Sequence, residues 1–282
     1  FIKLKNNILE INNLKVFPKV NTVNMLVNSI SFNVQRGKTT CIVGESGSGK
    51  SLTALSVMQL LSQQLKMSGK ILFNGSDLCL MDSESIRKKR GNEIAMIFQE
   101  PMTSLNPVLT IGYQIEESIV VHNDLTRSQL NARIVELLSL VAINPDRINS
   151  YPDELSGGQR QRIMIAMAMS CNPDLLIADE PTTALDVTVQ AQILDLLDQL
   201  KIKLQMSMLF ITHDFGVVAD IANDVIVMYQ GKIVEQGPVN LILNKPKHPY
   251  TKALLKCVPD ALGKKTLKPI DYKKLKIEMA AI

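Results

Sequence analysis

A glycine-rich segment in the first fifth of the chain carries residues whose types and spacing can bind phosphate. It reads Gly-Glu-Ser-Gly-Ser-Gly-Lys-Ser and fits the pattern G-x-x-x-x-G-K-[ST]. Its glycines let backbone N–H groups turn towards phosphate oxygens, because no Cβ is in the way. Lys50 then supplies a positive charge to the β- and γ-phosphates of a nucleotide, and the Ser51 hydroxyl is a Mg²⁺ ligand. We expect the nucleotide to contact Gly44, Glu45, Ser46, Gly47, Ser48, Gly49, Lys50 and Ser51.

The segments on either side of this loop have the patterns that such a site needs. Residues 39–43 (Thr-Thr-Cys-Ile-Val) form a short apolar strand pattern before the loop. Leu52, Leu55, Leu60 and Leu61 follow it at near-helical spacing. A phosphate held between such a strand and helix lies at the helix N-terminus, where unpaired N–H groups and the helix dipole favour an anion.

A second element with phosphate-related chemistry is the run Asp-Leu-Leu-Ile-Ala-Asp-Glu at residues 174–180. Its continuous apolar stretch predicts a strand that is buried on both faces of a parallel sheet. At the end of that strand, we expect Asp179 to hold Mg²⁺ through its water shell and Glu180 to polarise the attacking water. The alternative is a carboxylate that only caps the turn at Pro181.

The pentapeptide Leu-Ser-Gly-Gly-Gln at residues 155–159 predicts a second anion-binding helix start. Ser156 is a plausible N-cap for a helix from Gln159 to Ser170, and the two glycines leave the backbone bare. One nucleotide cannot use both helix starts within one subunit if they lie on different subdomains.

With these motifs in this order, the chain resembles the ATP-binding cassette (ABC) ATPases from about Leu9 to Leu255. In that family the signature motif of one subunit contacts ATP bound to the phosphate loop of another. The resemblance therefore implies a head-to-tail dimer with ATP at the interface. The residues that it assigns to the shared interface are Ser156, Gly157, Gly158, Gln159 and, in the segment that lines the dimer seam, Asp186.

The resemblance also assigns roles to two polar residues at predicted strand ends. Gln99 follows the apolar run 94–98 and matches the glutamine that reaches Mg²⁺ or the attacking water. His213 follows the apolar run 208–212 and matches the histidine that contacts the γ-phosphate. Together with Glu180 these residues make up the expected catalytic set, and Ser51, Gln99 and Asp179 make up the expected metal set. A histidine after a strand can also be purely structural.

The adenine site is expected at an aromatic residue shortly before the phosphate loop, as the family resemblance implies. Phe17 is the best candidate. It ends a strand pattern from Leu9 to Phe17 that alternates in polarity, so a core position for this ring is the alternative.

Composition fits a globular protein without obvious nucleic-acid or membrane-spanning character. The chain has 282 residues, 46% of them apolar and 21% charged, with a net charge of +4 that is too small to argue for nucleic acid. No apolar stretch approaches the roughly 20 residues that span a bilayer. No signal peptide is visible, and the four cysteines suggest neither a disulfide framework nor a metal site.

The predicted fold class is α/β: a P-loop NTPase core with a parallel sheet, an antiparallel β part and an inserted helical subdomain. We expect the core in residues 1–100 and 157–245, the helical subdomain in 101–156 and a C-terminal extension in 246–282. Thr126 and Gln129 form a capping-box pattern before an apolar helical stripe. The runs 225–229 and 232–234 predict a hairpin around Gly231.

Within the ABC ATPases, the chain resembles ATP-binding subunits of oligopeptide, dipeptide and nickel importers, in particular their D-type paralogue. The specific stretches are Phe-Gln-Glu-Pro-Met-Thr-Ser-Leu-Asn-Pro at 98–107 and His-Pro-Tyr-Thr at 248–251. The resemblance implies that the chain lies peripherally on the cytoplasmic face of the membrane. It implies an F-type ATPase partner, two transmembrane permease subunits and, indirectly, an extracytoplasmic solute-binding protein.

Several expectations follow from this narrower resemblance. Coupling helices of the membrane subunits should dock at residues 102–110, so Met102 and Leu105 should belong to the docking surface. No iron-sulfur cluster is expected, because no cysteine follows Cys257. Peptides are the expected cargo, with nickel or another small solute as the alternative. An ABC ATPase that acts on nucleic acid is disfavoured, because only one phosphate loop and one signature motif are present.

Overall fold

The computed structural model describes residues 6–20, 23–99, 104–183, 185–257, 270 and 272–280. The chain divides into two compact units, each with its own core. The first unit combines the chain up to Cys79 with the chain from Phe210 onward, and the second runs from Leu80 to Leu209. None of the described helices is long and apolar enough to cross a membrane.

An antiparallel sheet forms part of the first unit, with the strand order β2-β1-β4-β5. Its strands are β1 (Asn7–Pro18), β2 (Val27–Gln35), β4 (Leu65–Phe73) and β5 (Ser76–Asp77). Ile11 of β1 faces Phe32 of β2 and Ile71 of β4, and all three side chains are buried. The alternation of buried and exposed residues along β1 is interrupted at Asn13, which takes a positive φ of 52°, and the register with β2 shifts there.

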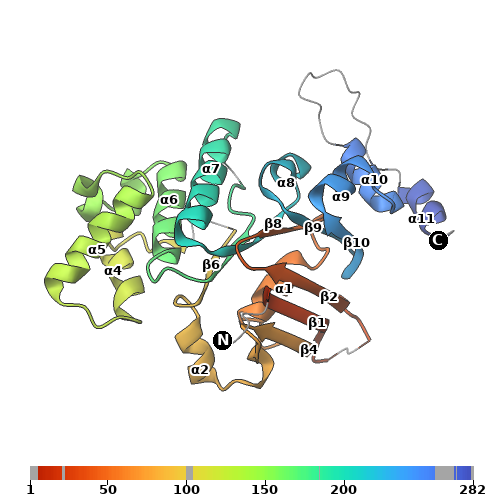
Figure 1. The fold of residues 1–282 in the computed structure, drawn as a ribbon, viewed down its shortest axis with the longest axis horizontal. Helices are drawn as coiled ribbons and strands as arrows, with labels where there is room; N and C mark the ends of the chain where they lie inside the picture. The colour runs from red at the N-terminus through yellow and green to blue at the C-terminus, as the bar shows by residue number, and fades with distance from the viewer. Residues whose placement is uncertain are drawn as a thin grey trace. The chain divides into compact units, whose positions relative to one another are not determined.

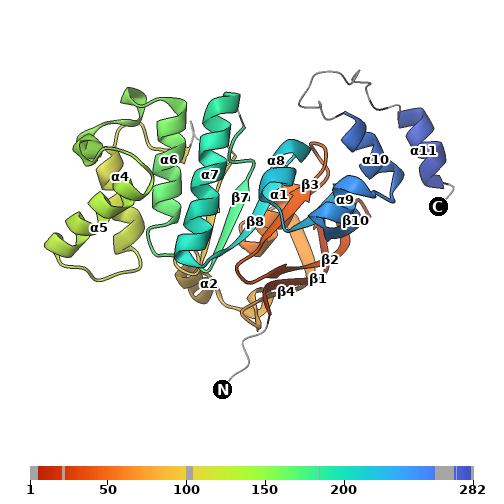
Figure 2. The same ribbon diagram turned by 45° about the horizontal axis from the view of Figure 1, so that its top comes forward.

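The first unit also contains the strand that leads into the phosphate loop. This strand, β3 (Thr39–Val43), is fully buried and runs parallel to β9 (Asp224–Tyr229). β9 pairs antiparallel with β10 (Lys232–Pro238) around Gly231, which confirms the predicted hairpin. The helices here are α1 (Lys50–Val57), α8 (Phe215–Ile221), α9 (Val239–Asn244), α10 (Pro249–Lys256) and α11 (Tyr272–Ala280), the last two side by side in Figure 2.

Helix α1 is shorter than its leucine pattern predicts. Gln59 takes a left-handed φ of 53°, and the Leu60 N–H donates to the Leu55 carbonyl at 2.9 Å. This 6→1 bond ends the helix, and Leu60 is 40% exposed. The helix buries Thr53, Ala54, Ser56 and Val57, and Leu60 and Leu61 lie beyond its end, so the helical prediction is wrong for these two leucines.

The second unit joins two parallel strands to a group of helices. β6 (Ile94–Ile97) pairs parallel with β7 (Leu175–Asp179), and every residue of β7 is buried, as its apolar run predicts. Between them along the chain come α4 (Ile111–Val120), α5 (Arg127–Leu140) and α6 (Gly157–Ala168), with short 3₁₀ turns at Pro145–Asn149 and Pro152–Glu154. Figure 1 shows α4 and α5 beside α6.

The remaining elements of the second unit stand before and after this group. The chain enters the second unit at the end of a 3₁₀ turn (Leu78–Leu80), α2 (Ser83–Lys89) precedes β6, and the side chains of Arg87 and Lys88 are largely exposed. α7 (Val187–Leu204) follows β7, and β8 (Ser207–Thr212) carries the chain back into the first unit. The expected α/β class, with parallel and antiparallel sheets and an inserted group of helices, is confirmed.

Local sequence signals explain how the helices of the second unit begin. Thr126 caps α5 with the reciprocal capping box that the sequence predicts, in which Gln129 accepts the Thr126 N–H at 3.0 Å. The apolar stripe behind it, formed by Leu130, Ile134, Leu137, Leu138 and Val141, is buried. Helix α5 therefore has both a defined start and a defined buried face.

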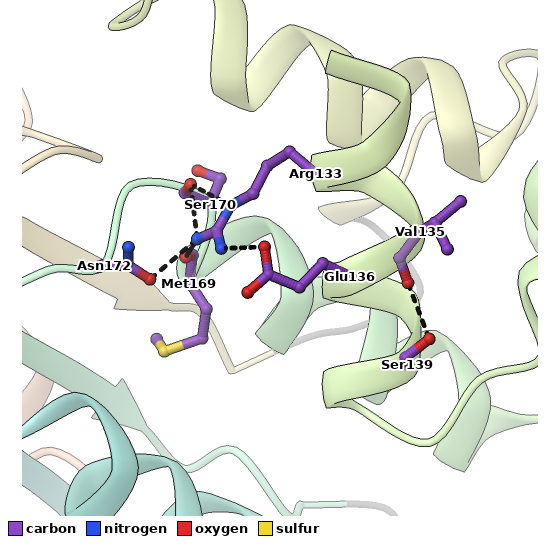
Figure 3. A network of polar contacts seen from close by, with 7 residues as sticks. All are labelled: Arg133, Val135, Glu136, Ser139, Met169, Ser170 and Asn172. Atoms are coloured by element: carbon purple, nitrogen blue, oxygen red, sulfur yellow. Dashed lines mark hydrogen bonds and ion pairs between the residues drawn. The ribbon is translucent and has the colours of Figure 1, made fainter. Parts of the chain in front are cut away.

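Arg133 of α5 binds the carboxyl end of α6 (Figure 3). Its guanidinium donates to the carbonyls of Met169 at 3.2 Å and Ser170 at 3.1 Å, and to Asn172 Oδ1 at 2.8 Å. It also pairs with Glu136 at 2.8 Å. The last carbonyls of a helix lack intrahelical partners, so a cation there is stabilising. Arg133 thus fixes the far end of the helix that begins at the signature motif.

Arg133→Ala should lower the free energy of unfolding by about 2 kcal/mol, because it removes charge-assisted bonds to half-buried carbonyls. Arg133→Lys should recover only part of this, since an ammonium lacks the planar fork that spans several acceptors. The control is Arg127→Ala, whose side chain is 70% exposed in its pair with Glu116 and should lose under about 1 kcal/mol. Urea unfolding measures all three, and equal losses at 133 and 127 would contradict the assignment.

Candidate functional site

The phosphate loop is fixed by close backbone contacts in the first unit. A Cβ on Gly44 would lie 2.2 Å from the Met228 carbonyl oxygen of β9, so only glycine fits there. Gly49 takes a φ of 100° as it starts α1, a conformation that glycine adopts without strain. The Gly231 N–H donates to the Ser48 carbonyl at 3.1 Å. Strand β9 and its hairpin turn therefore support the loop.

Two polar side chains inside the loop fit an anion. Lys50 is only 4% exposed, and its Nζ donates to the carbonyls of Gly44 at 2.8 Å and Glu45 at 3.0 Å. The Ser48 hydroxyl is buried and has no hydrogen-bond partner within the described chain. A buried ammonium and an unpartnered hydroxyl among glycine N–H groups suit phosphate oxygens. The donor set thus fits the predicted nucleotide.

A hollow of about 390 Å³ lies against the loop in the first unit. Its wall consists of loop residues and of side chains from β9, the hairpin turn and α11. The lining residues are Glu45, Ser46, Gly47, Ser48, Tyr229, Gln230 and Tyr272.

Phe17, the candidate for stacking adenine, lies half-buried at the end of β1. The neighbouring Val16 carbonyl accepts the Leu26 N–H at 2.8 Å, and the Leu26 carbonyl lies 3.1 Å from the position of a Cβ on Gly49. The residue before Phe17 is therefore bonded to Leu26, which in turn lies next to Gly49 of the phosphate loop. Its role in base binding stays a prediction.

The end of β7 brings together two of the predicted catalytic residues in the second unit. The Gln99 amide donates to Glu180 Oε2 at 3.3 Å, and the Thr183 hydroxyl donates to the same oxygen at 3.1 Å. Asp179 is 5% exposed, whereas Glu180 turns away with a left-handed φ of 47°. The two adjacent carboxylates therefore have different surroundings. Sequence reasoning missed Thr183, whose only signal is its position three residues after Glu180.

The signature motif begins α6 with a complete capping box. The Ser156 hydroxyl accepts the Gln159 N–H at 3.3 Å, and Gln159 Oε1 accepts the Ser156 N–H at 3.0 Å. The helix starts at Gly157, two residues before the predicted start. Ser156 and Gly157 are exposed, while a Cβ on Gly158 would lie 2.7 Å from Val189 of α7. The first glycine thus leaves backbone accessible, and the second allows two helices to pack.

Asp186 and His213 both stand at chain turns. Asp186 is exposed and caps α7 by accepting the Val189 N–H at 2.9 Å, directly before Val187, which is 84% exposed. His213 is exposed after β8, next to Asp214, which caps α8 through the Gly216 N–H at 2.7 Å. The first unit thus contains His213 with the phosphate loop and Phe17, and the second contains the remaining predicted site residues.

Sequence reasoning also missed two tyrosines that contact the phosphate loop from the C-terminal part of the chain. Tyr250 Oη accepts the Glu45 N–H at 3.2 Å, and the Tyr272 hydroxyl donates to the Glu45 carboxylate. That hydrogen bond is the main cause that raises the pKa of Tyr272 to about 12, so this phenol is protonated at neutral pH. Tyr250 belongs to the His-Pro-Tyr-Thr motif, which was the only sequence signal for this contact.

Comparison with protein families gives two matches along the chain. A family model described as ABC transporter matches residues 27–183, which is more than half of the sequence. A second model, described as oligopeptide/dipeptide transporter, C-terminal region, matches residues 234–279. The first covers the phosphate loop, the signature motif and Glu180, and the second covers both tyrosines.

Individual relatives agree with the family match. A putative peptide import ATP-binding protein of Brucella ovis is 54% identical over 243 residues, covering 83% of this chain and 72% of that protein. The glutathione import ATP-binding protein GsiA of Escherichia coli K12 is 50% identical over 276 residues, covering 94% of this chain and 44% of that protein.

Solved structures show the same fold. A dimeric ATP-binding cassette in a post-hydrolysis state with ADP and Pi has a TM-score of 0.72 at 25% identity, covering 82% of this chain and 98% of that one. A cbiO1 subunit from Clostridium perfringens has a TM-score of 0.74 at 26% identity, covering 86% and 92%. With the phosphate loop, the signature helix and the Gln99–Glu180 pair in place, we conclude that this chain belongs to the ATP-binding ATPase subunits of the ABC transporter family.

Proposed function

We propose that the chain hydrolyses ATP at a site shared with a second ATPase subunit and thereby energises peptide import across the cytoplasmic membrane. The observation that carries the catalytic part is the hydrogen bond between Gln99 and Glu180 at the end of β7. It holds a carboxylate in place beside a glutamine that can orient water. The domain division expected from sequence, with core, helical subdomain and C-terminal extension, is part of this proposal.

Each residue would have a defined task at the reacting end of ATP. Lys50 and the N–H groups of the phosphate loop would bind the β- and γ-phosphates, and His213 would contact the γ-phosphate. Glu180 would accept a proton from the attacking water, which Gln99 orients. Mg²⁺ would be held by Ser51, by Asp179 through water and by Gln99, and when bound it neutralises charge that develops on the phosphate oxygens.

The exposed start of α6 supports a site that is completed by another subunit. Ser156 and Gly157 present backbone at a helix N-terminus to solvent, where an anion from another chain can bind. Asp186 and the exposed Val187 would line the seam between the subunits. One of the similar solved structures is described as dimeric with ADP and Pi. An F-type paralogue is the proposed partner, with D-type identity for this chain.

Peptides are the proposed cargo class. The match over residues 234–279 is to an oligopeptide/dipeptide transporter region, and two relatives are named for import of peptide and of glutathione, itself a tripeptide. Two permease subunits would receive the ATPase at the cytoplasmic face, and an extracytoplasmic binding protein would select the solute. Nickel or another small solute is the alternative cargo.

Glu180→Gln should leave ATP binding intact and slow hydrolysis by roughly 10² to 10⁴-fold, because the amide keeps the shape of the side chain but cannot accept the proton. The slowed variant should accumulate as an ATP-bound dimer. Steady-state turnover and size-exclusion chromatography with MgATP measure both effects, and Glu154→Gln is the matched exposed control. Near-normal hydrolysis by the variant would refute Glu180 as the base.

The structure corrects one expectation about the docking surface for the membrane subunits. Leu105 is 3% exposed, so it belongs to the core of the second unit and not to a surface. Met102 lies outside the described residues. Within the described part of this stretch, Val108 is an exposed apolar residue, at 75%, in a turn where its N–H donates to Asn106 Oδ1 at 3.1 Å. We therefore propose Val108, in place of Leu105, for the docking contact.

Val108→Glu should reduce peptide uptake at least about tenfold in vesicles with the full transporter, because a charge desolvated in an interface costs more than about 1.4 kcal/mol. ATPase activity of the isolated chain should stay within about twofold of wild type, since the site residues are untouched. Ile202→Glu, at a residue of α7 that is 67% exposed, is the control. Unchanged uptake with Val108→Glu would move the docking surface elsewhere.

A further inference from the structure

The start of the His-Pro-Tyr-Thr motif at residues 248–251 is attached to β10 by hydrogen bonds from backbone N–H groups to a side chain of that strand. Glu235 of β10 accepts the N–H groups of Lys247 at 2.7 Å and His248 at 3.1 Å. His248 Nδ1 in turn accepts the Tyr250 N–H at 3.2 Å and so caps α10, with Pro249 in the first turn. These contacts fix where α10 begins and therefore where Tyr250 lies.

Tyr250 is completely buried below the phosphate loop. Its ring lies 4.3 Å from the ring of Tyr229 of β9, centroid to centroid, with the planes tilted by 42°. A buried phenol needs a hydrogen-bond partner, and here the partner is the Glu45 N–H at 3.2 Å. A residue of the C-terminal extension therefore accepts a main-chain hydrogen bond from the second position of the phosphate loop.

Tyr272 of α11 contacts the side chain of the same loop residue. Its hydroxyl donates to the Glu45 carboxylate, and Tyr272 and Glu45 both line the hollow against the loop. Helix α11 packs on α10, with Leu275 buried. Tyr272 is 46% exposed, so this contact is reached from solvent.

Glu45 is thus bound through all three of its polar groups. The N–H donates to Tyr250, the carboxylate accepts from Tyr272 and the carbonyl accepts from Lys50 Nζ at 3.0 Å. Lys50 also donates to Gly44. Glu45, whose carbonyl accepts from the Lys50 ammonium, is therefore also held by the two tyrosines.

We propose that Tyr250 and Tyr272 are positioning residues for ATP, which hold Glu45 so that the phosphate loop is preformed before the nucleotide arrives. This inference rests on the proposed ATP site and gives the C-terminal extension a role in it. A loop that is already ordered loses less conformational entropy on binding, so its affinity is higher. The tyrosines act through Glu45 and Lys50 and have no role in the chemical step.

The test measures MgATP affinity of the 282-residue chain by isothermal titration calorimetry, and KM and kcat for ATP. Tyr250→Phe keeps the ring and removes only the acceptor of the Glu45 N–H, so the Kd and KM should rise about two- to tenfold. The kcat should change less than about twofold. Tyr272→Phe should raise the Kd less, because its bond is half exposed. Tyr113→Phe, at an exposed residue of α4, is the matched control.

A double-mutant cycle separates the two tyrosines. Tyr272→Phe should have no further effect on the Kd once Glu45→Ala has removed the carboxylate. Tyr250→Phe should keep its full effect in the Glu45→Ala background, because its partner is the main-chain N–H. Tyr250→Leu removes the ring as well as the hydroxyl, so it should lower the melting temperature as well as the affinity for MgATP.

The possible outcomes distinguish this inference from the proposed function. A Kd for Tyr250→Phe and Tyr272→Phe equal to that of Tyr113→Phe, with only the melting temperature lowered, would leave the tyrosines a purely structural role and overturn the inference. Failure of the wild-type chain to bind MgATP would overturn the proposed function and this inference together. If Tyr250→Phe does not fold, the Tyr272→Phe and Glu45→Ala cycle still tests whether a tyrosine raises the affinity for MgATP through Glu45, and no change of the Kd in that cycle would overturn the inference.

Discussion

The rest of the site depends on the cost of burying the Lys50 ammonium. A buried cation is unfavourable unless it is paired and hydrogen-bonded, and Lys50 is held by two carbonyls of its own loop. Those carbonyls can receive it only if the loop backbone has one conformation. The contact between Gly44 and Met228 and the bond from Gly231 to Ser48 impose that conformation from β9. The β9–β10 hairpin therefore supports the loop that holds the Lys50 ammonium.

Backbone hydrogen bonding governs the second unit in a similar way. The N–H groups at the start of helix α6 and the carbonyls at its end lack intrahelical partners, and side chains bond to both ends. Ser156 and Gln159 cap the start, and Arg133 binds the carbonyls at the end. Gly158 lets α7 approach closely. Helix α6, which begins at the exposed signature motif, is thus held at both ends and packed against α7.

Local patterns predicted a large part of this structure because their causes are local. The strand at Thr39–Val43, the capping box at Thr126, the N-cap at Ser156 and the hairpin around Gly231 each depend on residues close in sequence. The family resemblance, based on motif order, was confirmed as well.

Features that depend on distant residues or on competing local bonds were missed. Helix α1 ends early because Gln59 takes a left-handed turn that no residue type there signals. Leu105 was predicted on a surface, although it is 3% exposed. The contacts of Tyr250 and Tyr272 with Glu45 join residues 205 and 227 positions apart, and no periodicity relates such positions. Only the folded sheet brings the C-terminal extension to the loop.

In the proposed ATP site, the buried Lys50 ammonium would exchange its loop carbonyls for phosphate oxygens. The most direct test compares the Kd of MgATP for the wild-type chain and Lys50→Ala by calorimetry, with unfolding of each nucleotide-free chain followed in parallel. Loss of a desolvated charge contact costs about 2–5 kcal/mol, so the variant should bind at least roughly 30-fold more weakly while it stays folded. A folded Lys50→Ala chain that binds MgATP as tightly as wild type would contradict the account.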